Sequence, residues 1–323
     1  MPLNFMNRFF FLVLFIVSST GFTQTDSINN SIPYQAYPDK LTTKLFTINT
    51  SNDFKLYFEE EDLHVELVPN KKTILGIGAH YDILAFSIGY SPRFLAENKD
   101  NDGSSLFTFS TDLFLGPWIQ HLEFIYQDGM TVRPRNLAPY YQDDLSSMKV
   151  GGSTSFKFNP RFSYNAMRFQ NQRQLENAGS FIPTLSYYYT TLDGIDNITY
   201  SNDAGFLNIA LTPSYYYNFV FKEHFLVSGG IGVGLGFTKT FDGEENHSSL
   251  LTRSFLSLAA GYNTDDFFAG FLTSGTVQKH QSAVNVDVSD TVKMISFFVG
   301  YRFNAPKPVV KVNDDVKDFF ARF

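Results

Sequence analysis

A strict two-residue alternation of apolar and polar side chains constrains this chain more than any other feature. In residues 207–219 the odd-numbered positions are mostly Leu, Ile or aromatic, and the even-numbered positions are mostly small or polar. Successive side chains of a strand point to opposite faces, so the pattern predicts a β-strand longer than most soluble ones. Pro213 cannot donate to the ladder, which predicts a bulge there. The same alternation recurs in residues 84–90, 121–126, 225–238 and 294–303.

Soluble β-sandwiches and transmembrane β-barrels both alternate in this way, and three features favour the barrel. The alternating segments are long, and their polar faces carry glycines and charges. Aromatic residues make up 17% of the chain and cluster near segment ends, as membrane-interface anchors do. We therefore expect an all-β fold, a transmembrane antiparallel up-and-down β-barrel of about 12 strands, over residues 40–303. Roughly fourteen strands result if Lys40–Asn49 and Phe54–Phe58 are both wall strands.

The N-terminus has the residue order of a secretory signal peptide. Arg8 precedes an apolar run over residues 9–17, and small and polar residues follow. The run is too short for a membrane-spanning helix, which needs about 20 residues. We expect residues 1–23 to be a signal peptide, residues 24–39 a periplasmic lead and residues 304–323 a C-terminal periplasmic extension.

Connection lengths predict an orientation, because outer-membrane barrels have short periplasmic turns and long outer loops. The orientation follows if the last strand ends in the periplasm at Phe303. The long connections at residues 92–104, 192–204, 241–249 and 280–291 are then outer, and residues 128–160 form a single outer excursion, with or without a hairpin of its own. The turns near residues 80–82, 116–117, 220–224 and 263–266 are periplasmic.

Several short motifs carry a family resemblance. They are Tyr37-Pro38-Asp39-Lys40, Val68-Pro69-Asn70, Leu75-Gly76-Ile77-Gly78-Ala79, Phe162-Ser163-Tyr164 and Ala178-Gly179-Ser180-Phe181. In this order they resemble the uncharacterised Bacteroidota outer-membrane β-barrel family called domain of unknown function 4421. The resemblance covers most of the mature chain and implies a barrel but no activity. The closing Tyr301-Arg302-Phe303 also resembles the signal read by the barrel-assembly machinery, although an extension follows it here.

Polar side chains on the inward face are the candidates for function. The lumen-facing candidates are Asp112, His121, Glu123, Asn208, Tyr216, Asn218, Ser228, Arg253 and Arg302. His121 and Glu123 lie two positions apart, so they are neighbours on one strand face. A Ser–His–acid hydrolase also needs a serine, and the sequence alone pairs none with them. We therefore expect a hydrogen-bonded polar lining, with no catalytic site, no metal site and no cofactor.

Three functions fit this pattern: a narrow pore or transporter, a side-chain-filled structural or surface-binding barrel, and a membrane-embedded lipid hydrolase. The net charge of −7 argues against nucleic acid, which requires clustered Lys and Arg. The chain has no cysteine, so disulfides and thiol chemistry are excluded. We expect the cell outer membrane as location, with outer-membrane lipid, lipopolysaccharide and the barrel-assembly machinery as partners.

Overall fold

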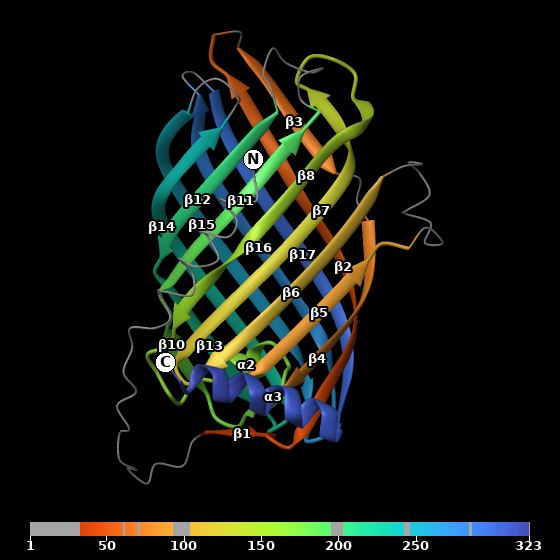
Figure 1. Cartoon of the computed structure of the whole chain (residues 1–323), viewed down its shortest axis with the longest axis vertical. Helices are drawn as coiled ribbons and strands as arrows, with labels where there is room; N and C mark the ends of the chain where they lie inside the picture. The colour runs from red at the N-terminus through yellow and green to blue at the C-terminus, as the bar shows by residue number, and fades with distance from the viewer. Residues whose placement is uncertain are drawn as a thin grey trace.

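The computed structural model describes residues 33–60, 62–69, 72–92, 104–194, 203–241, 246–283 and 286–322. The predicted signal peptide, residues 1–23, lies outside the described residues. Tilted antiparallel strands form a barrel (Figure 1), and β2 begins and β17 ends at the same rim. We call this rim the lower end and the opposite rim the upper end.

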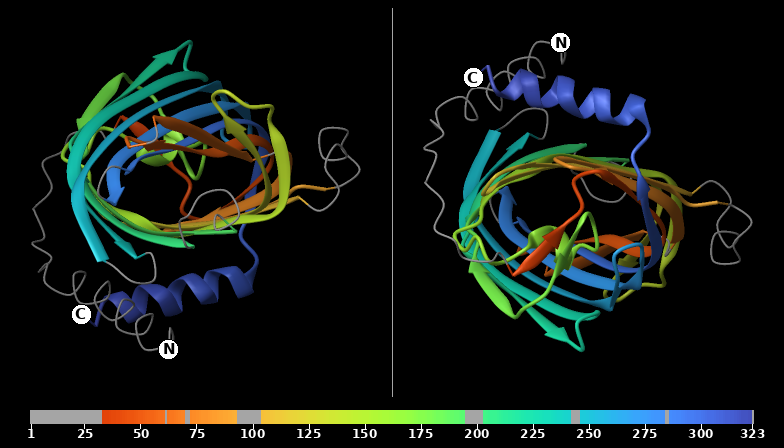
Figure 2. Two further views of the ribbon diagram at one scale, coloured as in Figure 1. Left: turned by 90° about the horizontal axis from the view of Figure 1, so that it is seen from above. Right: turned by 90° about the horizontal axis from the view of Figure 1, so that it is seen from below.

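Twelve strands form the wall, which confirms the predicted transmembrane barrel architecture. They are β2 (Lys40–Phe58), β4 (Lys72–Tyr81), β5 (Leu84–Tyr90), β6 (Ser105–Leu115), β7 (Trp118–Pro134), β8 (Tyr140–Phe156), β10 (Ala178–Phe181) with β11 (Thr184–Asp193), β12 (Ala204–Thr212) with β13 (Ser214–Phe221), β14 (Phe225–Phe241), β15 (Asn246–Asn263), β16 (Phe267–Ala283) and β17 (Val286–Asn304). The ring closes because β17 pairs with β2 and β14 pairs with β15 (Figure 2).

The bulge predicted at Pro213 is wrong: the proline only separates β12 from β13. Leu211 pairs with Leu235 before the proline, and Ser214 pairs with Gly232 after it, both on β14. The two pairings belong to one continuous register, so Pro213 breaks the strand without forming a bulge. β12 and β13 therefore act as a single wall strand.

The number of strands around the wall changes with height because of one short strand, β3 (Leu63–Pro69). β3 pairs with β2 on one side and with β7 on the other, whereas β4, β5 and β6 fill this interval lower down. The strands β5 and β6 therefore end below β3, and among the described residues the upper wall contains two fewer strands than the lower wall.

The exterior carries the apolar belt that the alternation predicts. Leu211 is 54% exposed, whereas its neighbour Thr212 is 2% exposed. On β14 the outward side chains of Ile231, Val233 and Leu235 are all exposed, while the intervening positions are small glycines. Exposed apolar side chains in this alternation fit a surface that contacts lipid.

The prediction of long outer loops at residues 241–249 and 280–291 is wrong. β14 continues to Phe241 and β15 begins at Asn246, while β16 ends at Ala283 and β17 begins at Val286. On β17 the outward side chains above Ile295 are polar. Beyond the apolar belt, outward side chains do not need to be apolar, because they no longer contact hydrocarbon. The apolar-outward pattern therefore ends there, although the hydrogen-bonded pairing of β16 with β17 continues. The strands therefore project past the belt.

The predicted single excursion over residues 128–160 is also wrong. β7 and β8 are long wall strands joined by a short connection over residues 135–139. Gly129, with φ +75°, shifts the register between Asp128 and Met130. Below this bulge the odd-numbered side chains of β7 point inward, and above it Met130 and Val132 do. The change of face hides the strand from a search for strict alternation.

The long connection between wall strands is residues 157–177, which fold into the lower end; we call them the plug. They contain α2 (Tyr164–Met167) and β9 (Gln172–Gln174). The Ser163 side chain accepts a hydrogen bond from the Ala166 amide and so caps α2. β1 (Tyr34–Ala36) pairs with β9, so the segment before the barrel crosses the plug.

A cluster of ten buried apolar side chains, each at most 6% exposed, occupies the upper interior; we call it the seal. Its members are Phe54, Leu56, Val65, Leu67, Met130, Val132, Leu145, Leu192, Phe206 and Val288. They come from seven strands around the ring, so they meet across the interior. Burial of this apolar surface favours a closed upper end.

After β17 the chain forms α3 (Lys307–Phe320), with Pro306 as its N-cap residue. α3 lies across the lower end of the barrel in Figure 1 and outside the ring in both views of Figure 2. None of the helices among the described residues has the length and apolar content needed to cross a membrane.

Candidate functional site

The interior between the seal and the plug is lined by polar and charged side chains; we call this region the polar layer. Along β17 the inward positions run from Val288 in the seal, through Asp290, to Phe298. Phe298 packs on Phe169 of the plug, with ring centroids 4.9 Å apart. The polar layer is thus bounded by apolar contacts at both ends.

Two of the predicted lumen-facing residues form an acid–histidine pair on adjacent strands. Asp112 on β6 pairs in register with His121 on β7, and Asp112 Oδ1 lies 2.7 Å from His121 Nδ1. The guanidinium of Arg168, on the plug, lies 4.0 Å from the other carboxylate oxygen. The pair therefore connects the wall electrostatically to the plug.

Ser153 on β8 is the register partner of His121, so acid, histidine and serine occupy adjacent strands. This is the residue order of a hydrolytic triad, and the sequence did not reveal it because β8 was not recognised as a wall strand. Among the described contacts His121 bonds to Asp112 and not to Ser153. The side chains of Asp112, His121 and Ser153 point into the closed interior, away from lipid. The arrangement supports attachment of the plug better than hydrolysis.

Glu123 and Arg253 lie in the same layer. The Tyr188 hydroxyl, on β11, donates to Glu123 Oε2 over 3.4 Å. Arg253, on β15, interacts electrostatically with Tyr188, and its Nε is buried without a hydrogen-bond partner among the described residues. Opposite charges therefore approach one another across the interior around Tyr188.

The most deeply buried ion pair joins two residues that the sequence analysis missed. Lys149 Nζ, on β8, lies 2.6 Å from Asp290 Oδ2, on β17, and both side chains are 3% exposed. β8 and β17 are separated by other wall strands in both directions around the ring, so the pair spans the interior. Lys149 lies on the same strand face as Ser147 and Gly151, because the three positions are two residues apart. The sequence shows this only after β8 has been recognised as a strand.

Asn208, another predicted candidate, belongs to a neutral network beside this pair. Thr238, on the adjacent strand β14, donates to Asn208 Oδ1 over 2.7 Å. Asn208 Nδ2 donates to Gln278 Oε1, on β16, over 3.3 Å. This second crossing contact fills more of the interior with side chains.

The remaining predicted residues hold the plug. Asn218 donates to the Ser163 carbonyl and to Gln174, both in the plug, and accepts from Ser228. Tyr216 packs on the rings of Phe162 and Tyr164. They therefore serve the contact between wall and plug.

Arg302 fixes the lower edge of the plug. It is 1% exposed; its Nε and Nη2 donate to the Gln170 carbonyl, and its Nη1 donates to the Thr264 carbonyl. The guanidinium also lies 4.7 Å from the ring centroids of both Tyr37 and Phe268. Hydrogen bonds donated by a charged guanidinium are stronger than hydrogen bonds between two neutral groups.

The segment before β2 is held at the same edge. The Tyr37 hydroxyl donates to Asp265 Oδ1 over 2.7 Å, and Arg173 of the plug lies 3.2 Å from the same oxygen. The hydrogen bond from Tyr37 and the nearby cations lower the pKa of Asp265 below its ordinary value. The carboxylate therefore joins three segments while it is ionised.

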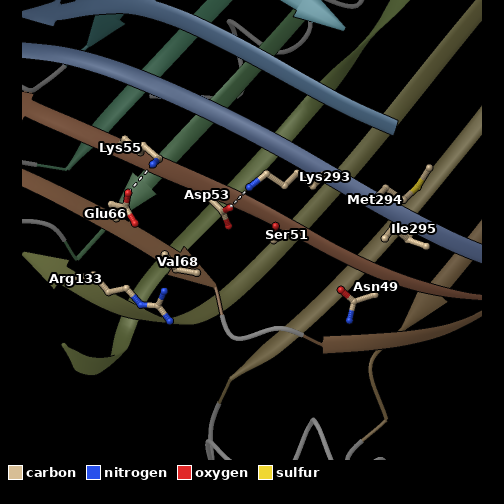
Figure 3. A pocket seen from close by; sticks show the side chains of 10 residues that line it. All are labelled: Asn49, Ser51, Asp53, Lys55, Glu66, Val68, Arg133, Lys293, Met294 and Ile295. Atoms are coloured by element: carbon tan, nitrogen blue, oxygen red, sulfur yellow. Dashed lines mark hydrogen bonds and ion pairs between the residues drawn. The ribbon is translucent and has the colours of Figure 1, made fainter. Parts of the chain in front are cut away.

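A groove of about 380 Å³ lies on the outer wall where β4 gives way to β3 (Figure 3). Lys55 Nζ lies 2.6 Å from Glu66 Oε1, and Lys293 Nζ lies 3.4 Å from Asp53 Oδ2. Arg133 lines the opposite side of the groove. Two of the three cations are thus paired, so the groove has little net charge with which to select a ligand.

Comparison with protein families identifies the chain. A family model described as Domain of unknown function (DUF4421) matches residues 33–303. The chain belongs to this family. The DUF4421 match covers β1, the plug and the whole wall, and it leaves α3 outside. A search of curated proteins finds no match.

Solved structures with a similar chain path are outer-membrane proteins of low identity to this DUF4421 protein. The outer membrane protease OmpT from Escherichia coli has 8% identity and a TM-score of 0.33, over 83% of this chain and 98% of that one. The COG4313 outer membrane channel from Pseudomonas putida F1 has 9% identity and a TM-score of 0.39, over 86% and 100%. The toluene transporter TodX from P. putida has 10% identity and a TM-score of 0.30, over 83% and 91%. These scores carry no argument about activity.

Proposed function

We propose that this DUF4421 protein is a side-chain-filled barrel of the cell outer membrane with a structural or surface-binding role. The seal carries this proposal. A diffusion pore needs a continuous hydrated path, whereas the seal places ten apolar side chains of at most 6% exposure across the upper interior. The plug adds a second obstruction at the other end.

The proposed orientation places the lower end in the periplasm. Both β1 and α3 are at that end, and apart from the plug the connections there are turns of two or three residues, at 82–83, 116–117, 222–224 and 264–266. Bacterial outer-membrane barrels place short turns in the periplasm. The upper connection surfaces would then face the cell exterior, where a surface-binding role would use them.

A gated transporter is the second candidate, and one observation favours it. The only strand of the plug, β9, pairs with β1 and with no described wall strand. Lys157 and Phe158, at the start of the plug, donate backbone hydrogen bonds to Pro117 and Phe181, and the other described hydrogen bonds between plug and wall involve a side chain. The plug could therefore leave the barrel without breaking the wall ladder. Transport would still require the seal to open, because the two obstructions lie in series.

Conductance in planar lipid bilayers tests the two proposals. We expect the wild type to be silent. Arg302→Ala, which loosens the plug, and Phe54→Ala with Leu56→Ala, which thins the seal, should each remain silent, because one obstruction persists. A steady current through the wild type would reject the filled barrel. Opening in the wild type with a solute gradient would favour the transporter.

A further inference from the structure

We propose that the outer wall of β16, β17, β2 and β3, above the apolar belt, binds the core saccharide of a lipopolysaccharide molecule. The proposal rests on the upper end facing the cell exterior, and it names the partner for the surface-binding role. Lipopolysaccharide has its acyl chains in the hydrocarbon of the outer leaflet, its phosphates at the hydrocarbon edge and its sugars above them. The wall has matching chemistry at each of these heights.

The groove in Figure 3 forms the lower part of this surface. It begins beside Ile295, the highest outward apolar side chain on β17, and Lys293 is the next outward position above it. Lys293 is 66% exposed and reaches Asp53 only at 3.4 Å. Arg133 is exposed and has no acidic partner among the described residues. The groove has little net charge, but these two cations lie at the hydrocarbon edge, where the phosphates of the lipid are.

A second groove, of about 510 Å³, continues upward from the first and shares Lys55 with it. It lies across two adjacent rows of outward side chains, which the strand register places side by side on β16, β17, β2 and β3. The upper row is Gln281, Asp287, Tyr57 and His64, and the lower row contains Lys279, Ser289 and Lys55.

The second groove lies well above the apolar belt. Ser289 is six residues from Ile295 along β17, which corresponds to about 20 Å at about 3.3 Å per residue. With strands tilted by about 40°, the groove is about 15 Å higher than the edge of the belt. Groups at the hydrocarbon edge do not reach this height, so the groove meets the sugars of the outer leaflet.

The second groove has the chemistry of a saccharide site more than that of a site for a simple anion. Tyr57 packs on His64, with ring centroids 4.2 Å apart, and this contact orients the phenol ring. A tyrosine ring has an apolar body for sugar C–H groups and a hydroxyl for hydrogen bonding. Lys279 supplies donors, Asp287 supplies acceptors and Gln281 supplies both. A few polar groups around an apolar surface are the usual composition of a small-molecule site.

Titration calorimetry tests the proposal on the full chain refolded into detergent micelles. The probes are rough-type lipopolysaccharide, which is lipid A with its core saccharide, and lipid A alone, both in the same detergent. We expect rough-type lipopolysaccharide to bind at least tenfold more tightly than lipid A, because only the former reaches the second groove. The free core oligosaccharide should compete with it.

Two variants localise the binding. Tyr57→Ser should remove most of the preference for rough-type lipopolysaccharide and leave the affinity for lipid A unchanged. Lys279→Ser should weaken the binding of rough-type lipopolysaccharide several-fold. Tyr126→Ser is the matched control, because Tyr126 is an outward tyrosine on β7 that is 36% exposed and lies outside both grooves. Heat-modifiability on gels shows that each variant is folded.

Three results would overturn the saccharide site: no binding of rough-type lipopolysaccharide, equal affinity for lipid A, or a preference that Tyr57→Ser leaves intact. Labelling of intact cells distinguishes these results from a failure of the orientation, since the chain has no native cysteine. Arg135→Cys is in an upper connection and Lys222→Cys is in a lower turn. If a membrane-impermeant maleimide labels only 135, a negative titration rejects the saccharide site alone. If it labels only 222, the barrel is inverted and both proposals fail.

Discussion

Lys149 and Asp290 form an ion pair across the barrel interior, with Nζ 2.6 Å from Oδ2 and both side chains almost completely buried. Removing one partner leaves the other charge buried and unpaired, which typically costs about 3–5 kcal/mol. We expect Lys149→Met to reduce the free energy of unfolding by about this amount. Urea unfolding followed through Trp118, the single tryptophan, measures the change.

Two further variants make this prediction specific. Lys149→Met combined with Asp290→Leu should recover most of the lost stability, because no charge remains unpaired. Lys55→Met removes one partner of an exposed pair with Glu66 and should cost no more than about 1 kcal/mol. A double variant as unstable as Lys149→Met alone would show that the pair contributes through packing.

The second prediction concerns the upper edge of the apolar belt on β17. Phe297 and Thr291 share the outward face, and Phe297 is 62% exposed. Phe297→Arg should cost about 2–4 kcal/mol in phospholipid vesicles, because it places a charge in hydrocarbon. Thr291→Arg lies above the belt, opposite Asp53, and should cost no more than about 1 kcal/mol. If the two variants lost equal amounts of folded protein on heat-modifiability gels, the upper edge of the apolar belt would have to lie above Thr291.

The third prediction compares two glycines on β14. A Cβ on Gly236 would collide with the backbone carbonyl of Ile209, whereas one on Gly229 would lie 3.5 Å from the nearest side-chain atom, on Leu258. Gly236→Ala should therefore reduce the free energy of unfolding by about 1–3 kcal/mol. Gly229→Ala should be neutral or stabilising. Comparable urea midpoints for the two variants would mean that the strands near Gly236 have room to separate.

The fourth prediction is a pH dependence at the lower edge. The pKa of Asp265 is lowered in the folded protein, first by the Tyr37 hydrogen bond. A lowered pKa means that the carboxylate stabilises the fold above its unfolded pKa of about 3.9 and loses this effect as pH falls through the folded pKa. The protection of the amides of residues 34–37 against exchange, taken relative to their intrinsic rates at each pH, should therefore fall below about pH 4. Asp265→Asn should exchange faster already at neutral pH and lose the dependence.

The sequence predicts the wall well where one face contacts lipid and the other does not. Leu211 and Thr212 show this, since they differ in exposure as their alternation predicts. The pattern fails at Gly129, where a bulge exchanges the faces, and on β17 above Ile295, where the outward face is polar and most inward side chains are apolar. At these two places the chain forms a strand because it pairs with neighbouring strands, and a single sequence does not reveal those partners.

The interior was less predictable than the wall. The candidates Asp112 and His121 meet in register, but Arg168 comes from the plug and has no period that would identify it. Lys149 and Asp290 are far apart in the chain and meet only because the ring closes. Thr212 faces the interior as its parity predicts, but it is only 2% exposed, so an arginine at this position would be buried among other side chains.

The replacement of the β4–β6 portion of the wall by β3 changes the outline of the molecule. Barrel diameter follows strand number, so a wall that falls from twelve to ten strands narrows by about one sixth. The narrowing begins near Ser51, just above the apolar belt, and is confined to one side. On that side the wall steps inward above the described ends of β5 and β6. The protein is therefore not cylindrically symmetric, and neighbours that pack beside it in the membrane meet a different profile at this step than around the rest of the wall.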